Sequence, residues 1–107
     1  MYNLYDSELP KKGKCLTVIN NDQPMVIITT GEINKIIEED HSREFYSIGY
    51  MCKLHCRNLT VNSGNIIIYK NTILRNSSKE EKKDLYKYLK KINLKFNYKT
   101  KKIEMFP

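Results

Sequence analysis

Apolar and β-branched residues form short clusters near the start of the chain, with turn-forming residues between them. Residues 15 to 19 read CLTVI, residues 25 to 29 read MVIIT, and the NNDQP between them supplies Asn, Asp and Pro. Because β-branched residues favour strands while Asn, Asp and Pro favour turns, this pattern predicts a β-hairpin. The YNLY at residues 2 to 5 has the composition of a further short strand.

From Thr29 onwards, apolar residues recur at helical spacing. Thr29 and Glu32 have the spacing of a capping box, and the isoleucines that follow predict a helix over residues 31 to 40. Ser42 is a candidate N-cap for a second helix. Steps of three and four residues give this second helix one continuous apolar stripe, formed by Phe45, Ile48, Cys52, Cys56 and Leu59.

Four further segments have the character of strands. The IIIY at residues 66 to 69 and the TIL at 72 to 74 predict two strands that pair with each other. The alternating LKFNY at 94 to 98 and the IEMF at 103 to 106 predict a closing hairpin.

Between these two pairs of strands lies a third predicted helix. Ser78 and Glu81 repeat the capping-box spacing, and the helix extends to about residue 92. Its buried face is expected to be Leu85, Leu89 and Ile92, with Tyr88 at the edge.

These elements together predict one α+β domain. A mainly antiparallel sheet of about five to seven strands would carry three helices, in the order ββααββαββ. With 107 residues, the chain can bury most of its apolar surface as one domain but is too short for two. The predicted core consists of Phe45, Ile48, Cys52, Cys56, Leu59, Leu85, Leu89 and Ile92.

Residue usage is strongly skewed. Ile (13), Lys (16), Asn (11) and Tyr (8) fill 48 of the 107 positions, and the chain has 3 Arg and no Ala or Trp. The codons of the favoured residues are rich in A and T. Composition therefore indicates an AT-rich genome, such as that of a virus, a phage, a plasmid or an AT-rich bacterium.

Several features bear on the compartment. No apolar run approaches the roughly 18 residues of a membrane span, and the N-terminal MYNLYDSELPKKGK lacks the apolar core and cleavage site of a secretion signal. The three cysteines show no disulfide spacing, which favours reduced thiols. We therefore expect a cytosolic protein, in its own cell or in a host cell, with no membrane partner.

The MCKLHC at residues 51 to 56 raises the question of a metal site. Cys52, His55 and Cys56 would need a fourth zinc ligand, either Cys15 or His41. Structural zinc sites usually draw pairs of ligands from two separate loops, whereas this chain has one cluster. Three ligands on consecutive turns of a helix also fit a tetrahedron poorly, so we predict no metal site.

Catalysis by these side chains is a further alternative. A cysteine nucleophile would need a histidine base, and a carboxylate from Glu38, Glu39 or Asp40 could act with His41 in acid–base chemistry. Cysteines on a buried stripe are usually inert, and a run of acids at a helix end is usually solvated. No residue is therefore predicted to be catalytic.

Positive charge is concentrated in the last third of the chain. Residues 1 to 69 hold 7 Lys/Arg and 8 Asp/Glu, whereas residues 70 to 107 hold 12 and 4, a net charge of +8. Genome bias would spread lysine evenly, so this asymmetry predicts a basic surface. The residues predicted to bind a polyanion or another partner are Lys79, Lys83, Lys87, Lys90, Lys91, Lys95, Lys99, Lys101 and Lys102.

Three interpretations of these lysines stay open. Clustered cations bind phosphates, and Tyr86, Tyr98 and Phe106 could stack on bases, which favours nucleic acid or another polyanion. An acidic protein partner fits the charge equally well. Lysines opposite an apolar stripe are also what a solvated helix in a lysine-rich protein would show.

Two motifs in the first 60 residues resemble small viral and phage anti-CRISPR ring nucleases, which cleave cyclic tetra-adenylate and so disable type III CRISPR signalling. LYDSELP at residues 4 to 10 is similar to the opening strand of that family, and YSIGY at 46 to 50 is similar to its Ser-x-Ile-Gly-His at a helix start. The family's histidine, implicated in cleavage, is replaced here by Tyr50, so the resemblance implies binding without efficient cleavage. The ligand-binding residues that it implies are Ser7, Ser47, Gly49 and Tyr50.

The function predicted from these observations is that of a small cytosolic binding or inhibitory protein of a virus, phage or mobile element. It would antagonise a host process through its basic C-terminal surface. The alternatives are a ring-nuclease-like protein that binds or cleaves cyclic oligoadenylate, and a nucleic-acid-binding accessory protein. We expect a host protein, a nucleic acid or an oligonucleotide as partner and no cofactor, and a homodimer is left open. A binding role is favoured over an enzymatic one.

Overall fold

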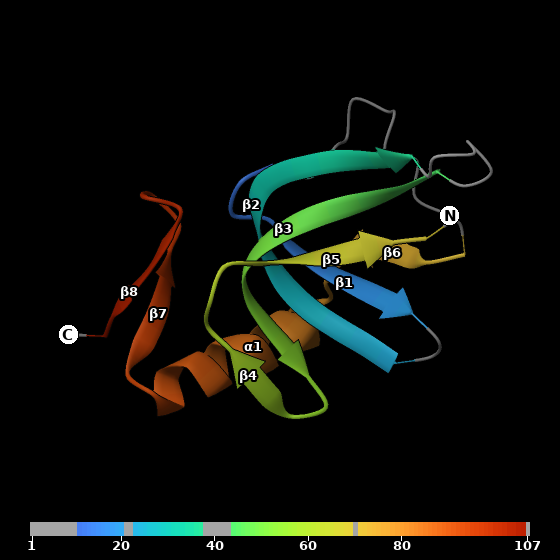
Figure 1. Ribbon diagram of the computed structural model, residues 1–107. Coiled ribbons are helices and arrows are strands. Elements are labelled where there is room, and N and C mark those ends of the chain that lie inside the picture. The colour runs from blue at the N-terminus through green and yellow to red at the C-terminus, as the bar shows by residue number, and fades with distance from the viewer. Residues whose placement is uncertain (1–10, 21–22, 38–43, 70, 107) are drawn as a thin grey trace.

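The computed structural model describes residues 11–20, 23–37, 44–69 and 71–106. These residues form eight strands and one α-helix (Figure 1). The elements are β1 (Cys15–Asn20), β2 (Gln23–Ile37), β3 (Glu44–His55), β4 (Asn58–Thr60), β5 (Gly64–Ile68), β6 (Ile73–Asn76), α1 (Lys79–Lys91), β7 (Leu94–Asn97) and β8 (Lys102–Met105).

Six strands form one antiparallel sheet whose last strand returns to the first. The order is β4-β3-β2-β1-β6, and β5 pairs with the other end of β3. The long strands β2 and β3 curve, so the sheet wraps around an interior, as Figure 1 shows. At the open seam, the side-chain amide of Asn20 in β1 donates to the Ile67 carbonyl in β5 (3.4 Å) and accepts from the Thr72 hydroxyl. The sheet is therefore a small, partly open barrel, in which the Asn20 side chain bridges the seam between β5 and β6 in place of strand pairing.

Apolar side chains pack on both faces of the central strands. The interior of the curved sheet contains Leu16, Val18, Ile27, Ile48, Tyr50, Ile66, Ile68 and Leu74. On the outer face, α1 and β7 complete a second cluster of Cys15, Val26, Ile28, Cys52, Leu54, Leu85, Leu89 and Phe96. Successive strand residues point to opposite faces, so sequence neighbours such as Ile27 and Ile28 belong to different clusters. Burial on both faces accounts for the apolar run of β2 and for the largely apolar run of β1, where the buried Thr17 is hydrogen-bonded to Ser77.

The predicted order ββααββαββ, with three helices, is wrong. The described part of the chain has one helix, and its order is six strands, a helix and two strands. Residues 31–37 continue β2, and residues 44–55 form β3, while residues 38–43 lie outside the described ranges. The even-numbered positions from Tyr46 to Leu54 are all hydrophobic, so the segment has a strand-like period of two beside its helical stripe. Pairing with β2 and β5 makes it a strand.

The apparent capping box at Thr29 has a different use. The Thr29 hydroxyl accepts a hydrogen bond from the Lys14 backbone N–H (3.1 Å) and donates to the Lys11 carbonyl. These bonds join the segment before β1 to β2. The pairing of β2 with β3 shifts its register in the middle of β2, between Thr29 and Ile33. Gly31, with φ of 93°, adopts there a conformation that side chains disfavour. The segment is thus a bulged strand instead of a helix start.

Other predictions have mixed outcomes. The hairpin β1–β2, the helix α1 and the hairpin β7–β8 are confirmed. The predicted pairing of residues 66–69 with 72–74 is wrong, because β5 pairs with β3 and β6 pairs with β1. The strand predicted at residues 2 to 5 lies outside the described ranges.

The predicted core is correct in part. Ile48, Cys52, Leu85 and Leu89 are buried as predicted. Phe45 and Leu59 are half-buried, whereas Cys56 and Ile92 are exposed. Cys56 is exposed because it occupies the turn between β3 and β4, and Ile92 because it follows the last residue of α1.

Thiol labelling distinguishes this strand arrangement from the helical one. Cys52 is fully buried, and burial raises the pKa of its thiol to about 12, while burial also raises the pKa of Cys15. We expect the folded protein at pH 8 to react quickly with a maleimide at Cys56 alone, because thiolates are the reactive form and only this thiol is exposed. Mass spectrometry of the digested protein locates the label. Rapid labelling of Cys52 in the folded state, or protection of Cys56, would contradict the structure.

Candidate polyanion-binding surface

The helix α1 lies against the outer face of the barrel, and its lysines point away from it. Leu85 and Leu89 are fully buried in the outer cluster. Helical geometry places four lysines of the opposite face within an arc of about 80°. These four, Lys79, Lys83, Lys87 and Lys90, are exposed and are called here the helix lysine row.

The charges of the helix lysine row are not compensated by carboxylates. Among the described residues, the salt bridge joins Arg75 to Glu81. No carboxylate oxygen of the described residues lies within 4.0 Å of the Nζ atom of a lysine in the row. The other acids of the helix, Glu80 and Asp84, are exposed beside the row rather than paired with it. The row therefore presents ammonium groups that are free to bind an anion.

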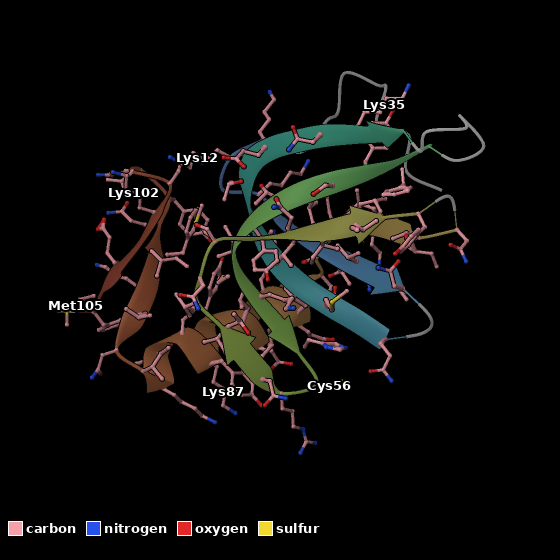
Figure 2. All side chains as sticks on the ribbon, viewed as in Figure 1. Lys12, Lys35, Cys56, Lys87, Lys102 and Met105 are labelled. Atoms are coloured by element: carbon pink, nitrogen blue, oxygen red, sulfur yellow. The ribbon has the colours of Figure 1, made fainter. Side chains whose placement is uncertain are left out.

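A groove of about 440 Å³ runs along one edge of the helix lysine row. It lies between α1 and the ends of β2, β3 and β4, and is lined by Pro24, Val26, Leu54, Cys56, Arg57, Glu81, Asp84, Lys87, Tyr88 and Lys91. Figure 2 shows Lys87 and Cys56 on the same side of the molecule. Lys87, Lys91 and Arg57 bring positive charge to the groove, while two carboxylates make its lining mixed in sign. The groove thus extends the basic surface to Arg57.

Arg57 was not among the residues predicted from the sequence. It lies with Cys56 in a two-residue turn between β3 and β4, and both have positive φ values, 65° and 50°. Such turns favour Asn-Gly, so a Cys-Arg pair gives no recognisable turn signal. The Cys56 thiol donates to the Gln23 side-chain oxygen (3.0 Å), which ties the turn to β2.

The remaining predicted lysines lie on the C-terminal hairpin. Phe96 anchors the hairpin in the outer cluster, and the Asn97 side-chain oxygen accepts from the Lys99 backbone N–H (2.8 Å), which stabilises its turn. The turn carries Lys99 and Lys101, and Lys102 is the first residue of β8. Figure 2 places Lys102 at the opposite end of this part of the molecule from Lys87. The lysines at the turn of the hairpin therefore lie apart from the helix lysine row, whereas Lys95 in β7 meets Lys90 of the row at the Phe106 ring.

The lysines at the hairpin turn gain one neighbour, Lys12, that the sequence prediction omitted. A Cβ atom on Gly13 would lie 2.7 Å from the Lys101 side chain and 3.0 Å from the Phe96 ring, so the segment before β1 touches the hairpin. Lys12 lies near Lys102 in Figure 2. Only the tertiary contact between these distant segments brings their charges together.

The three aromatic residues predicted to stack on bases differ in their contacts within the fold. The hydroxyls of Tyr86 and Tyr98 share a hydrogen bond, and their rings meet edge to face at 6.3 Å between centroids. The Tyr86 ring is half-buried against the outer cluster, and this burial raises the pKa of its hydroxyl. Phe106 is exposed near the C-terminal end of α1.

The residues implied by the ring-nuclease resemblance lie in the barrel. Ser47, Gly49 and Tyr50 are buried positions of β3, and Ser7 lies outside the described residues. Tyr50 lies opposite Gly64 of β5, and its hydroxyl fills the space beside this glycine. A Cβ atom on Gly64 would be 2.5 Å from the Tyr50 hydroxyl oxygen. A side chain on Gly49 would collide with Thr30. These residues therefore have a packing role here, and YSIGY is part of a strand instead of a helix start.

The MCKLHC segment does not form a ligand cluster. Cys52 packs in the outer cluster, Cys56 lies in a turn, and the Nε2 atom of His55 is buried without a hydrogen-bond partner. No group of three metal-ligating side chains occurs within the described ranges. His41 and the acids at residues 38 to 40, which the sequence offered as further candidates, lie outside those ranges.

No protein-family model, curated protein or solved structure matches this chain. In the part of the chain that the structure describes, no helix is long and apolar enough to cross a membrane.

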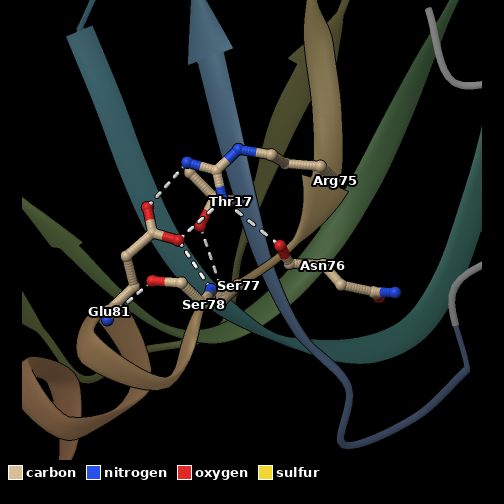
Figure 3. Close-up of polar contacts among 6 residues, drawn as sticks. All are labelled: Thr17, Arg75, Asn76, Ser77, Ser78 and Glu81. Carbon is tan, nitrogen blue, oxygen red and sulfur yellow. Dashed lines mark hydrogen bonds and ion pairs between the residues drawn. The ribbon is translucent and has the colours of Figure 1, made fainter.

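A polar junction fixes the start of α1 on the barrel (Figure 3). Arg75 at the end of β6 donates two hydrogen bonds to the Glu81 carboxylate (2.7 and 3.0 Å). Glu81 and Ser78 form a reciprocal capping box, and the buried hydroxyls of Thr17 and Ser77 bond to each other at 2.8 Å. Because the junction joins β1, β6 and α1, it sets the direction in which the helix lysine row points.

The junction makes stability depend on pH in a defined direction. Hydrogen bonding to Arg75 lowers the pKa of Glu81 from 4.5 to about 2. A lowered pKa contributes stability above pH 4.5, and this contribution is lost as the pH falls through the folded-state value. We expect Glu81→Gln, which keeps capping ability but loses the charge, to lower the free energy of unfolding by about 1 kcal/mol at pH 7. The difference should shrink steadily below pH 4.5.

Urea unfolding followed by circular dichroism between pH 7 and pH 3 measures this difference. Glu80→Gln is the matched control, because Glu80 is an exposed acid in the same first turn. It should change stability much less than Glu81→Gln. A difference between wild type and Glu81→Gln that stays constant with pH would show that the Glu81 charge does not stabilise the junction.

Proposed function

We propose that this protein is a binding protein that captures a phosphate-bearing polyanion through the helix lysine row. The observation that carries the proposal is a set of four exposed ammonium groups on one side of α1, without carboxylate partners among the described residues. An ammonium group that contacts a phosphate displaces a counterion condensed on the nucleic acid. The release of these counterions would supply affinity that does not depend on the base sequence.

The geometry of the row suits a linear polymer. Lys79, Lys83 and Lys87 follow one another at intervals of four residues, so each step advances about 6 Å along the helix axis. Lysine is depleted in protein–protein interfaces, whereas phosphate groups are contacted mainly by lysine and arginine. These two properties favour a nucleic acid or oligonucleotide over an acidic protein as the partner.

This mode of binding needs no catalytic residue. Sequestering a nucleic acid or oligonucleotide in a host cytosol would inhibit any process that depends on it. Such an inhibitory role would suit a phage, a virus or a mobile element, which are among the AT-rich sources that fit the composition. Cyclic tetra-adenylate, the ligand that the ring-nuclease resemblance implies, also carries phosphates and belongs among the ligands to be tested.

Neutralising part of the helix lysine row should weaken binding and reduce its dependence on salt. We expect the triple variant Lys83→Gln, Lys87→Gln, Lys90→Gln to lose most of its affinity for a labelled oligonucleotide. The slope of log K against log salt should fall by about two for a single strand, or nearer three for a duplex, since each phosphate contact contributes about 0.7 or 0.9. Fluorescence anisotropy from 50 to 200 mM salt measures both quantities.

The matched control removes the same charge from the hairpin turn, in the variant Lys99→Gln, Lys101→Gln, Lys102→Gln. Its affinity and slope should change much less. Equal losses in the two variants would mean that binding follows total charge rather than the helix lysine row. Unchanged binding in the first variant, with a folded circular dichroism spectrum, would remove the proposal.

A further inference from the structure

The helix lysine row ends beside an exposed aromatic ring. The Phe106 backbone N–H donates to the Asn93 carbonyl (2.6 Å), which holds the residue after β8 against the end of α1. The Nζ atoms of Lys90 and Lys95 lie 5.6 and 6.0 Å from the centroid of the Phe106 ring. One ring is thus flanked by two ammonium groups, one of which belongs to the row.

The Phe106 ring has no structural use comparable with those of its neighbours. It is 43% exposed and belongs to neither apolar cluster, whereas Phe96 is buried in the outer one. Tyr86 and Tyr98 are engaged with each other. The ring is thus partly exposed and carries the two ammonium groups over it. A nucleobase can take the place of these ammonium groups on the ring, and the lysines can then contact the adjacent phosphates.

We propose that the ligand is single-stranded nucleic acid, with its backbone along the helix lysine row and one base stacked on Phe106. This inference rests on the proposed function and narrows its ligand class. In a duplex the base faces are covered by their neighbours, so a ring can stack only on a base that is unpaired or flipped out. A phosphate polymer without bases would use the lysines and leave the ring unused.

The surroundings of Phe106 also favour a linear ligand over an anionic membrane. Two exposed apolar residues belong to this end of the row: Ile92, 52% exposed, is the C-cap of α1, and Met105, 78% exposed, directly precedes Phe106. The lysines continue from there along α1 for about 16 Å, from Lys90 to Lys79. A bilayer would use the apolar end and leave most of the row without a partner, whereas a nucleic-acid strand can follow its whole length.

The test compares Phe106→Leu with Phe106→Tyr against several probes. The probes are a 15-nucleotide oligothymidylate, the corresponding duplex, inorganic polyphosphate, and vesicles of phosphatidylcholine with phosphatidylserine. Phe106→Leu should weaken oligothymidylate binding at least about fivefold, the lower limit for losing one stacked base. Phe106→Tyr should retain it, and polyphosphate should bind all three proteins equally. Wild type should prefer the single strand to the duplex.

Met105→Ala is the control for loss of exposed apolar surface without loss of a ring. It should bind oligothymidylate as wild type does, and thermal unfolding confirms that each variant is folded. An unchanged affinity of Phe106→Leu, an equal loss for polyphosphate, or an equal loss in Met105→Ala would overturn the stacking proposal. Each would leave the helix lysine row intact as a polyanion site. Tighter binding of vesicles or duplex than of the single strand would also overturn it. Failure of every polyanion to bind wild type would remove the proposed function itself.

Discussion

The structure depends on the burial of both faces of the central strands. Residues that are adjacent in β1 and β2 point alternately into the barrel and towards α1, so neither face can be left to solvent. Leu85 and Leu89 cover the outer face and Phe96 extends the cover. Removing the helix would expose the outer cluster, including the fully buried Ile28 and Cys52. The helix therefore has one stable orientation, in which its lysines face outwards.

The helix dipole acts differently on the two ends of the helix lysine row. Lys90 in the last turn is favoured by the negative end of the helix dipole, whereas Lys79 lies in the first turn, where the dipole disfavours cations and favours the neighbouring Glu80 and Glu81. The Arg75–Glu81 junction and the capping box stabilise that end by other means. The dipole therefore stabilises the C-terminal end of the row, and the capping box and the two acids stabilise the end that carries Lys79.

The parts of the fold that could be predicted are those specified by local signals. Ser78 and Glu81 cap α1 because both partners lie within one turn, and short turns specify the hairpins β1–β2 and β7–β8. The segment around Ile48 and Cys52 fits both a helical stripe and strand alternation, and packing against β2 and β5 decides for the strand. The lysines of the site could be read from the sequence. The contribution of Arg57 and the separation of the hairpin lysines could not, because both depend on contacts between distant segments.

Mapping where a ligand contacts the folded protein shows directly whether α1 and Phe106 form the binding surface. In a ¹⁵N-labelled sample titrated with a short single-stranded oligonucleotide, we expect the largest changes in amide chemical shift along Lys79–Lys91 and at Phe106. The amides inside the barrel, such as those of Ile27 and Ile48, should change little. Shift changes confined to β5 and β6, or to the hairpin turn at residues 98–101, would contradict it, as would a spectrum that does not change at all.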